Sequence, residues 1–397
     1  MPCPGGGSRP GGRAAEREDV MLSFIRERET LWERLARTER PVVLYGTGDG
    51  ADKVLARLAR SGVPVRDIYV SDDFARGQEF HGYRVRKIRE LEEGPGPEIV
   101  LLAFASERPE LLARFRRLAA VRETYAPHVP LFAGDAALDR GWLAAHEEAL
   151  QYVHGHLADD LSRRVFADIL DYRLSGRLPY LWDAETRRDG DLHSLFTFGP
   201  DETYADLGAY DGDTVREFLA LCHGTYRAVY AFEPDPKNYA RLTAWAASYA
   251  ASHPGAGPVH CVQAAAGAAP GTAVFHAGGG RQSSLLDTGS GLAGGRRRRR
   301  KERELAVEAA DHVLGPQRLD YAKLDVEGAE AAALEGLRHH LVPDGAGRLP
   351  KLLVAAYHHD DDLFRLPLLL WKLQPAYRIW LRKHPYVPAW EINLFAC

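Results

Sequence analysis

The sequence has few cysteines, no long apolar run and no large excess of charge of one sign. Its four cysteines, Cys3, Cys222, Cys261 and Cys397, have neither the spacing of metal ligands nor the density of a disulfide framework, which favours the reducing cytoplasm. No apolar run reaches the roughly 18 residues of a membrane span, so we expect no membrane insertion. A formal net charge of −4 gives no electrostatic reason to expect nucleic acid as a partner.

The composition is that of a globular protein long enough for two cores. Of its 397 residues, 45% are hydrophobic and 27% are charged. Residues 1–18 are rich in proline, glycine and arginine and lack the apolar stretch of a signal peptide, so we expect a disordered tail there. Apolar residues at helical spacing predict a helix from Leu22 to Leu35, directly after Met21, and we interpret the functional start as lying at or near Met21.

Residues 19–135 alternate between strand and helix patterns. The buried strand Val42–Tyr45 leads into a glycine-rich turn and a helix. The elements expected after them are strands at 68–70 and 99–104, a helix at 109–120 and a short strand at 129–132. This β-α-β-β-α-β order is that of half a doubly wound sheet, so we expect a small Rossmann-like α/β domain here.

The turn after the first strand matches the relaxed dinucleotide pattern, as Gly46-x-Gly48-x-x-Ala51 with Asp72 at about the expected distance. Such a motif is weakly specific on its own, and the domain lacks a second mononucleotide half. Two interpretations stay open. One is a module that binds a nucleotide-like ligand or a sugar nucleotide, and the other is a docking domain that has lost its ligand.

A helical bridge over residues 136–195 separates this domain from a larger one over residues 196–397. Apolar residues between Leu157 and Leu170 recur at helical spacing, and Gly176 ends that pattern. The strands expected beyond the bridge are 203–207, 228–232, 259–262, 271–275, 305–308, 321–326, 352–358, 377–381 and 392–395. Five alternating β/α units followed by a hairpin predict a Rossmann-like parallel sheet with a terminal antiparallel hairpin.

Two helices of this larger domain have expected ends. Thr214 follows the strand 203–207 and is expected to cap the next helix through its hydroxyl. The helix after the strand 321–326 is expected to run to about Leu341.

The stretch from Thr203 to Thr214 reads as a strand, a tight turn and the start of a helix. It carries Asp206, Gly208 and Gly212 in the spacing Asp-x-Gly-x-x-x-Gly, which differs from the dinucleotide turn. A carboxylate at the strand end repels a pyrophosphate but suits a cation. The turn is therefore consistent with a cationic ligand without phosphate, such as the sulfonium and amino group of S-adenosylmethionine, and equally with an ordinary strand-to-helix turn.

Further carboxylates follow at two other predicted strand ends. Glu233 ends the next strand, where a carboxylate can accept both ribose hydroxyls of a nucleoside; the alternative is a surface glutamate before a turn proline. Asp325 ends an apolar strand and, with Glu327 and Glu330, places three carboxylates around one turn. Burying them unpaired is costly, so we expect a cation, a metal or a polar substrate to satisfy them.

Taken together, four segments resemble the FkbM-type methyltransferases, and the resemblance covers about residues 196–397. They are Asp206–Gly212, Glu233-Pro234, the block Lys323-Leu324-Asp325-Val326-Glu327-Gly328-Ala329-Glu330, and Tyr357-His358. The block is the specific part, because the Asp206 motif occurs in many nucleotide-binding proteins. The Gly46 domain and the bridge look like the N-terminal extension that some bacterial members carry.

This resemblance implies a class I methyltransferase fold, S-adenosylmethionine as the cofactor and a hydroxyl as the methyl acceptor. It implies that the cofactor-binding residues are Asp206, Gly208, Ala209, Tyr210, Asp211, Gly212, Glu233, Pro234, Ala265 and Asp325. The sequence departs from the family in its run Arg296–Lys301, inserted where members usually have a short loop. A solvated loop explains the run, and a site for an anionic substrate tail or a phosphate is the alternative.

Transfer to a hydroxyl is helped by a base, and His358 is the first candidate because it ends its predicted strand and faces the same crevice as Asp325. The alternative is a structural histidine bonded to the Asp360–Asp362 cluster. Asp325 and Glu327 complete the expected catalytic set; they could instead bind a divalent metal. No histidine cluster has metal spacing, so the metal alternative ranks second and no metal is expected.

The leading hypothesis is a cytoplasmic S-adenosylmethionine-dependent O-methyltransferase that acts on a sugar, a glycan or a secondary metabolite. One alternative is an oxidoreductase that binds NAD(P) or a nucleotide sugar at Gly46, but no catalytic Lys/Tyr or Cys pattern follows that motif. Another is a non-catalytic binding protein, against which the intact Asp206, Glu233 and Asp325 argue. The acceptor and the oligomeric state, a homodimer included, stay open.

Overall fold

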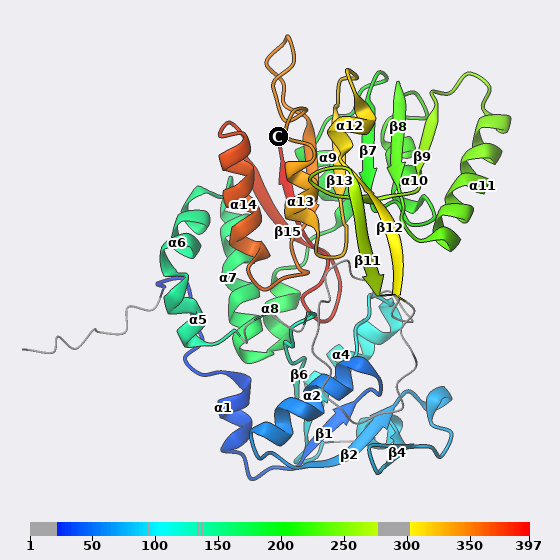
Figure 1. Cartoon of the computed structure of the whole chain (residues 1–397). Coiled ribbons are helices and arrows are strands. Elements are labelled where there is room, and N and C mark those ends of the chain that lie inside the picture. The colour runs from blue at the N-terminus through cyan, green and yellow to red at the C-terminus, as the bar shows by residue number, and fades with distance from the viewer. Residues whose placement is uncertain (1–21, 94, 133–134, 136–137, 277–301) are drawn as a thin grey trace, which may run out of the picture.

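The computed structural model describes residues 22–93, 95–132, 135, 138–276 and 302–397, and these form two large sheets and one small sheet. In Figure 1 the N-terminal sheet lies at the bottom and the C-terminal sheet at the top, with helices α7 and α8 between them. The predicted tail over residues 1–18 and the run Arg296–Lys301 lie outside the described residues.

The N-terminal sheet has six strands in the order β3-β4-β2-β1-β5-β6, and all pairs except β3–β4 are parallel. Its strands are β1 (Val42–Tyr45), β2 (Val65–Val70), β3 (Glu79–Phe80), β4 (Tyr83–Lys87), β5 (Ile99–Leu102) and β6 (Glu123–Tyr125). Its helices are α1 (Leu31–Ala36), α2 (Asp49–Arg60), the short 3₁₀ helix η1 (Asp72–Phe74), α3 (Arg89–Glu92) and α4 (Pro109–Val121). The central strands β1 and β5 are buried throughout, as their continuous apolar runs predict.

Two local predictions in this part are wrong. The strand expected at 129–132 does not form, and β6 takes the edge position instead; the carbonyls of Pro130 and Leu131 accept hydrogen bonds from Lys53 Nζ, both at 3.1 Å. The helix expected from Leu22 begins only at Leu31. The preceding Thr30 caps α1 in a capping box, and that cap fixes where the helix starts.

The bridge is helical, as expected, and its longest helix, α7, is buried on all sides from Val165 onward. Its helices are α5 (Arg140–Ala145), α6 (Glu147–His156), α7 (Asp160–Ser175), α8 (Leu178–Asp183) and α9 (Arg188–Leu195). Asp171 of α7 accepts hydrogen bonds from the backbone N–H groups of Arg26 and Glu27, both at 2.9 Å. Gly176 ends α7 in the left-handed conformation, as a C-terminal glycine should.

The C-terminal sheet has seven strands in the order β15-β16-β14-β13-β7-β8-β9. Its strands are β7 (Thr203–Leu207), β8 (Ala228–Phe232), β9 (Val259–Val262), β13 (Tyr321–Leu324), β14 (Lys351–Ala355), β15 (Ile379–Lys383) and β16 (Ile392–Ala396). Five strands are parallel, and β16 pairs antiparallel with both β14 and β15. The predicted fold class, a Rossmann-like sheet with a terminal antiparallel hairpin beside a smaller Rossmann-like domain, is confirmed.

The helices of this domain are α10 (Asp213–Leu221), α11 (Pro236–Ser252), α12 (Ala310–Leu314), α13 (Glu330–Glu335) and α14 (Asp362–Leu373). Two of them differ from expectation. Helix α10 is preceded by Gly212 as its N-cap, because the hydroxyl of Thr214 is bonded to Asp206 instead. Helix α13 ends at Glu335, about six residues before the expected end near Leu341. Gly336, the next residue, packs closely on the backbone of Gly267.

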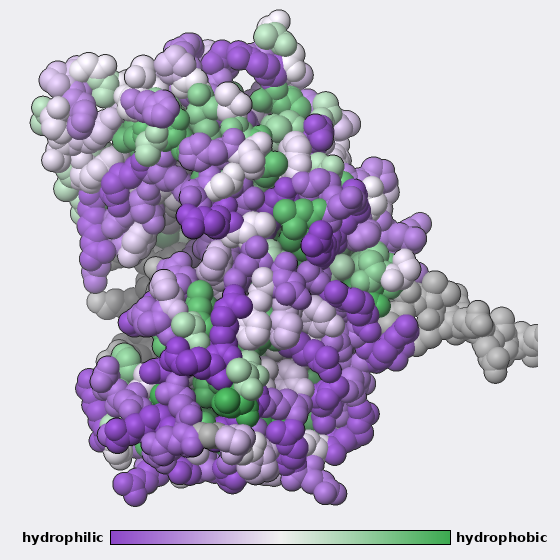
Figure 2. Space-filling view, turned by 180° about the vertical axis from the view of Figure 1, so that it is seen from behind, coloured by the Kyte–Doolittle hydropathy of each residue, from purple (hydrophilic) through white to green (hydrophobic). Residues whose placement is uncertain are grey.

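A three-stranded sheet made of β10 (Ala265–Ala266), β11 (Gly271–His276) and β12 (Glu302–Glu308) lies beside the C-terminal sheet. On the face in Figure 2 the described apolar residues form small separate patches on a mostly hydrophilic surface. Among the described residues, no helix combines the length and the apolar character needed to cross a membrane.

Candidate active site

The turn between β7 and α10 brings its backbone against the neighbouring turn after β13. Gly208 has a φ of +96° and Gly212 a φ of +87°, a conformation that side chains rarely adopt. A Cβ atom on Gly208 would lie 2.0 Å from the carbonyl oxygen of Asp325. The first glycine of the motif is therefore required by the close approach of two turns, one of which carries the predicted catalytic acids.

Asp206 lies beneath this turn and is fully buried. Its Oδ2 accepts a hydrogen bond of 2.5 Å from the Thr214 hydroxyl, and its Oδ1 lies 3.6 Å from Lys323 Nζ. Lys323 also donates to the Gly208 carbonyl at 2.8 Å. Burial lowers the pKa of Lys323, but the Asp206 carboxylate more than offsets this and the pKa ends above its usual value. The ion pair thus holds the turn from below.

Glu233 follows β8 and binds the same turn from the side. Its Oε2 accepts from the Tyr210 N–H at 2.9 Å, and its Oε1 accepts from the Asp235 N–H at 2.8 Å. The side chain is largely buried, and this burial raises the pKa of Glu233 to about 7 despite the two backbone hydrogen bonds. In this structure Glu233 therefore links the β7–α10 turn to the start of α11.

The remaining residues of the predicted cofactor set lie around these two turns. Ala209 is buried, whereas Tyr210 is exposed and has a φ of +48°. Asp211 pairs with Arg216 at 2.9 Å. Pro234 directly follows Glu233, and Ala265 is the buried first residue of β10, paired with Val307 of β12. Ala265 thus belongs to the small sheet beyond β9.

The turn between β13 and α13 carries the acidic block. Glu327 and Gly328 both have positive φ, at +55° and +99°. Glu330 is fully buried, and its Oε1 accepts hydrogen bonds from the backbone N–H groups of Val326 at 2.8 Å and Gly328 at 3.4 Å. Asp325 and Glu327 are partly exposed, with side-chain exposures of 33% and 47%. The turn therefore has one buried carboxylate and two that reach solvent.

His358 follows β14 and lies among all three carboxylates. Its Nε2 is 3.6 Å from Asp325 Oδ1 and 3.5 Å from Glu327 Oε2, and its Nδ1 is 3.0 Å from Glu330 Oε1. The Nδ1 contact is close but not aligned, so that this nitrogen makes no hydrogen bond. Burial opposes protonation, yet Glu330 and Glu327 raise the pKa of His358 well above its usual value.

Residues from the N-terminal part of the chain reach this turn, and the sequence did not predict it. The Phe132 ring stacks on His359 at 4.5 Å, and a Cβ atom on Gly328 would lie 2.8 Å from the Phe132 ring. His128 bonds to Asp360 at 2.7 Å. Phe132 itself gave no signal for such a contact, because the contact depends on the packing of two segments far apart in the chain.

The Gly46 turn of the N-terminal sheet has different neighbouring residues. Gly46 and Gly48 have φ of +131° and +125°, and a Cβ atom on Gly46 would lie 2.8 Å from the Phe104 ring. Acidic residues Asp49 and Asp52 occupy the first turn of α2, and Asp72 lies in η1. These carboxylates oppose a phosphate at the helix N-terminus.

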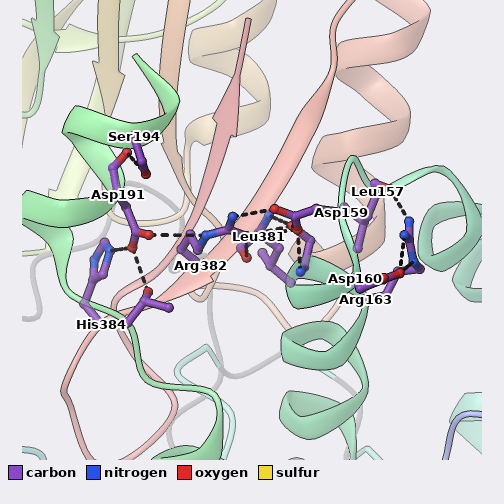
Figure 3. A network of polar contacts seen from close by, with 11 residues as sticks. Leu157, Asp159, Asp160, Arg163, Asp191, Ser194, Leu381, Arg382 and His384 are labelled. Carbon is purple, nitrogen blue, oxygen red and sulfur yellow. Dashed lines mark hydrogen bonds and ion pairs between the residues drawn. The ribbon is translucent and has the colours of Figure 1, made fainter. Parts of the chain in front are cut away.

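A buried polar network connects the bridge to the terminal hairpin, as Figure 3 shows. Arg382 of β15 pairs with Asp159 at 2.6 Å, and its Nε is 3.3 Å from Asp191. Asp191 also pairs with His384 at 3.2 Å. Asp159 is partly buried, but its hydrogen bonds with Arg382 and Ser162 lower its pKa to about 2. The network fixes α7 and α9 against the edge of the sheet, away from the acidic block.

The fold is that of a Rossmann-like α/β protein with carboxylates at the ends of its parallel strands. Residues 206–345 match the model of the methyltransferase FkbM domain, so the chain contains a methyltransferase domain of the FkbM family. A search of the curated proteins found no match.

Solved structures agree with this assignment at the level of the fold. The structure of a methyltransferase FkbM from Methylobacillus flagellatus KT is 19% identical, with a TM-score of 0.63, and the match covers 96% of each chain. A putative rRNA-methylase from Clostridium thermocellum is 11% identical, and the match covers 53% of this chain and 95% of that chain with a TM-score of 0.33. The likeness to the first structure includes the N-terminal part of this chain.

Proposed function

We propose that this methyltransferase transfers the methyl group of S-adenosylmethionine to a hydroxyl of a sugar, a glycan or a secondary metabolite. One observation carries the proposal. The ends of the parallel strands β8, β7, β13 and β14 lie next to one another and carry Glu233, the Gly208 turn, Asp325 and His358. Ligands of open α/β sheets bind at this edge.

The cofactor side of this edge is formed by the Gly208–Gly212 turn and Glu233. We propose that the Glu233 carboxylate accepts the ribose hydroxyls, because it lies at the second strand end and already orders the turn. Asp206 supports the turn from beneath through its contacts with Lys323 and Thr214. The backbone of residues 208–212 then forms the surface that the cofactor contacts. Direct contacts by Ala209, Pro234 and Ala265 stay predictions.

The acceptor side is formed by His358, Asp325 and Glu327. A hydroxyl placed beside Asp325 and Glu327 would lie near Nε2 of His358, which is 3.6 Å from Asp325 and 3.5 Å from Glu327. We propose that the neutral imidazole of His358 takes the hydroxyl proton as the methyl group is transferred, and that Asp325 and Glu327 stabilise the imidazolium that forms. Alignment of the sulfonium with that hydroxyl supplies the rest of the rate enhancement.

Replacing His358 tests this role. His358→Ala should lower turnover by roughly 10²–10⁴-fold while S-adenosylhomocysteine binding stays nearly unchanged, measured by a methyl-transfer assay and by calorimetry. His312→Ala is the control, because the His312 side chain is exposed and pairs with Glu308 at 2.9 Å, outside the proposed site. Joint loss of stability and cofactor binding in His358→Ala would make His358 a structural residue.

Two other functions are weaker. Binding of NAD(P) or a nucleotide sugar at Gly46 is opposed by the carboxylates of α2, and a nucleotide-like ligand there stays an untested expectation. A non-catalytic binding protein would leave Asp325 and Glu327 without a role. The cytoplasmic location and a homodimer stay predictions from the sequence.

A further inference from the structure

The acidic block, Asp325, Glu327 and Glu330, carries more negative charge than the neighbouring basic side chains can neutralise. Among the described residues, His358 is the single basic side chain within ion-pair distance of Asp325, Glu327 or Glu330. The nearby Arg365 pairs with Asp361 and Asp362 instead. Three carboxylates thus share one imidazole at a partly buried site, where unbalanced charge is costly.

Two buried polar atoms of this cluster also lack hydrogen-bond partners. They are Nδ1 of His358 and Oε2 of Glu330, and both side chains are at least 97% buried, with exposures of 3% and 0%. Buried polar groups are nearly always satisfied, so two unsatisfied atoms on side chains that contact each other, with Nδ1 of His358 3.0 Å from Oε1 of Glu330, indicate a missing partner. The partner must satisfy a nitrogen lone pair and carboxylate oxygens together, which a cation can do.

The distances suit a divalent metal. Asp325, Glu330 and His358 each offer one ligand atom, and these atoms lie within 4.8 Å of one another. Ligand atoms placed about 2.1 Å from one cation are separated by about 3–4 Å, so a small movement closes the site. The turn holds Glu330 through two backbone N–H groups, and Glu327 lies on the open side.

We propose that Asp325, Glu330 and His358 bind a divalent transition-metal cation, with Glu327 at its solvent side. Mixed carboxylate and imidazole ligands suit Mn²⁺, Fe²⁺ or Zn²⁺ better than Ca²⁺. The inference rests on the proposed function for its purpose, since a cation here would bind the acceptor oxygen and favour loss of its proton to Glu327, with His358 then a ligand and not the base. Three protein ligands leave coordination positions open for that oxygen.

Calorimetry with MnCl₂ on the full chain, after dialysis against a chelator, tests the site directly. We expect one Mn²⁺ per chain, and binding weakened about tenfold or more by Asp325→Asn and by Glu330→Gln. The matched control is Glu335→Gln, the same change at the other end of α13, which should bind Mn²⁺ like the unmodified chain. Asp325 is partly exposed, so its variant tests the site even if Glu330→Gln fails to fold.

The other outcomes overturn the inference and are separable from failure of the proposed function. Absence of stoichiometric Mn²⁺ binding, or binding that both variants leave unchanged, contradicts the metal site. Competition between Mn²⁺ and S-adenosylhomocysteine would also contradict it, because the carboxylates would then hold the cofactor. Binding of S-adenosylhomocysteine by the metal-free chain is measured in the same experiment, so the cofactor proposal stands or falls on its own result.

Discussion

The turn between β1 and α2 and the turn between β7 and α10 have the same local construction in the two large sheets. Each follows a buried central strand, and each has two glycines with positive φ: Gly46 and Gly48 in one, Gly208 and Gly212 in the other. Their neighbours differ. Gly46 packs on the Phe104 ring, whereas Gly208 packs on the backbone of Asp325.

The glycine spacing therefore sets the shape of each turn, whereas the neighbouring strand ends set its chemistry. The C-terminal turn has a buried ion pair beneath it and acidic side chains beside it. The N-terminal turn has a surface pair, Lys53 with Asp49 at 3.3 Å. The same lysine also donates a hydrogen bond to the backbone carbonyl of Pro130. Paired substitutions in the two turns test whether their surroundings differ in this way.

The largest expected effect comes from Asp206→Ala. Removing this carboxylate leaves Lys323 buried without its ion-pair partner, so the free energy of unfolding should fall by about 3–5 kcal/mol. The equivalent change in the other turn, Asp49→Ala, removes a surface pair and should cost less than about 1 kcal/mol. Urea unfolding measures both, and equal losses would show that the two turns are not differently supported.

Gly208→Ala should have the next largest effect. The new Cβ atom would collide with the Asp325 carbonyl, and the positive φ adds strain, so we expect a loss of about 3 kcal/mol and impaired cofactor binding. Gly48→Ala keeps the strain but meets open space, so it should cost about 1 kcal/mol and leave cofactor affinity unchanged. A Gly208→Ala variant with full affinity for S-adenosylhomocysteine would separate the turn from the cofactor site.

The smallest effect is a pH dependence from Glu233. Its folded-state pKa of about 7 lies above the ordinary value of 4.5, so the folded chain binds this proton more tightly than the unfolded chain. The resulting stability is present below about pH 4.5 and is lost as the pH rises to about 7. Relative to Glu233→Gln, the unmodified chain should lose about 1–3 kcal/mol over this window. A constant difference between the two proteins would mean that Glu233 is ionised throughout.

The sequence predicted the central strands of both large sheets and the carboxylates at their ends, because apolar runs and the acidic residues that follow them are local signals. It could not predict that Thr214 binds Asp206 rather than capping α10, since one hydroxyl has two partners and the tertiary fold selects between them. Neither Lys323 under the Gly208 turn nor Phe132 against Gly328 was predicted, because both contacts join segments far apart in the chain. The roles of Glu233, Asp325 and His358 stay predictions.

Calorimetric titration of the full chain with S-adenosylhomocysteine tests directly whether the cofactor binds at the C-terminal sheet. We predict one site per chain, and affinity reduced roughly ten- to a hundredfold by Glu233→Ala, which removes hydrogen bonds between a charged group and the ribose worth roughly 1.5–3 kcal/mol. Gly48→Ala should leave both the stoichiometry and the affinity as they are. A cofactor site at the C-terminal sheet would be contradicted if the unmodified chain did not bind S-adenosylhomocysteine. It would also be contradicted if Gly48→Ala lost binding while Glu233→Ala kept it.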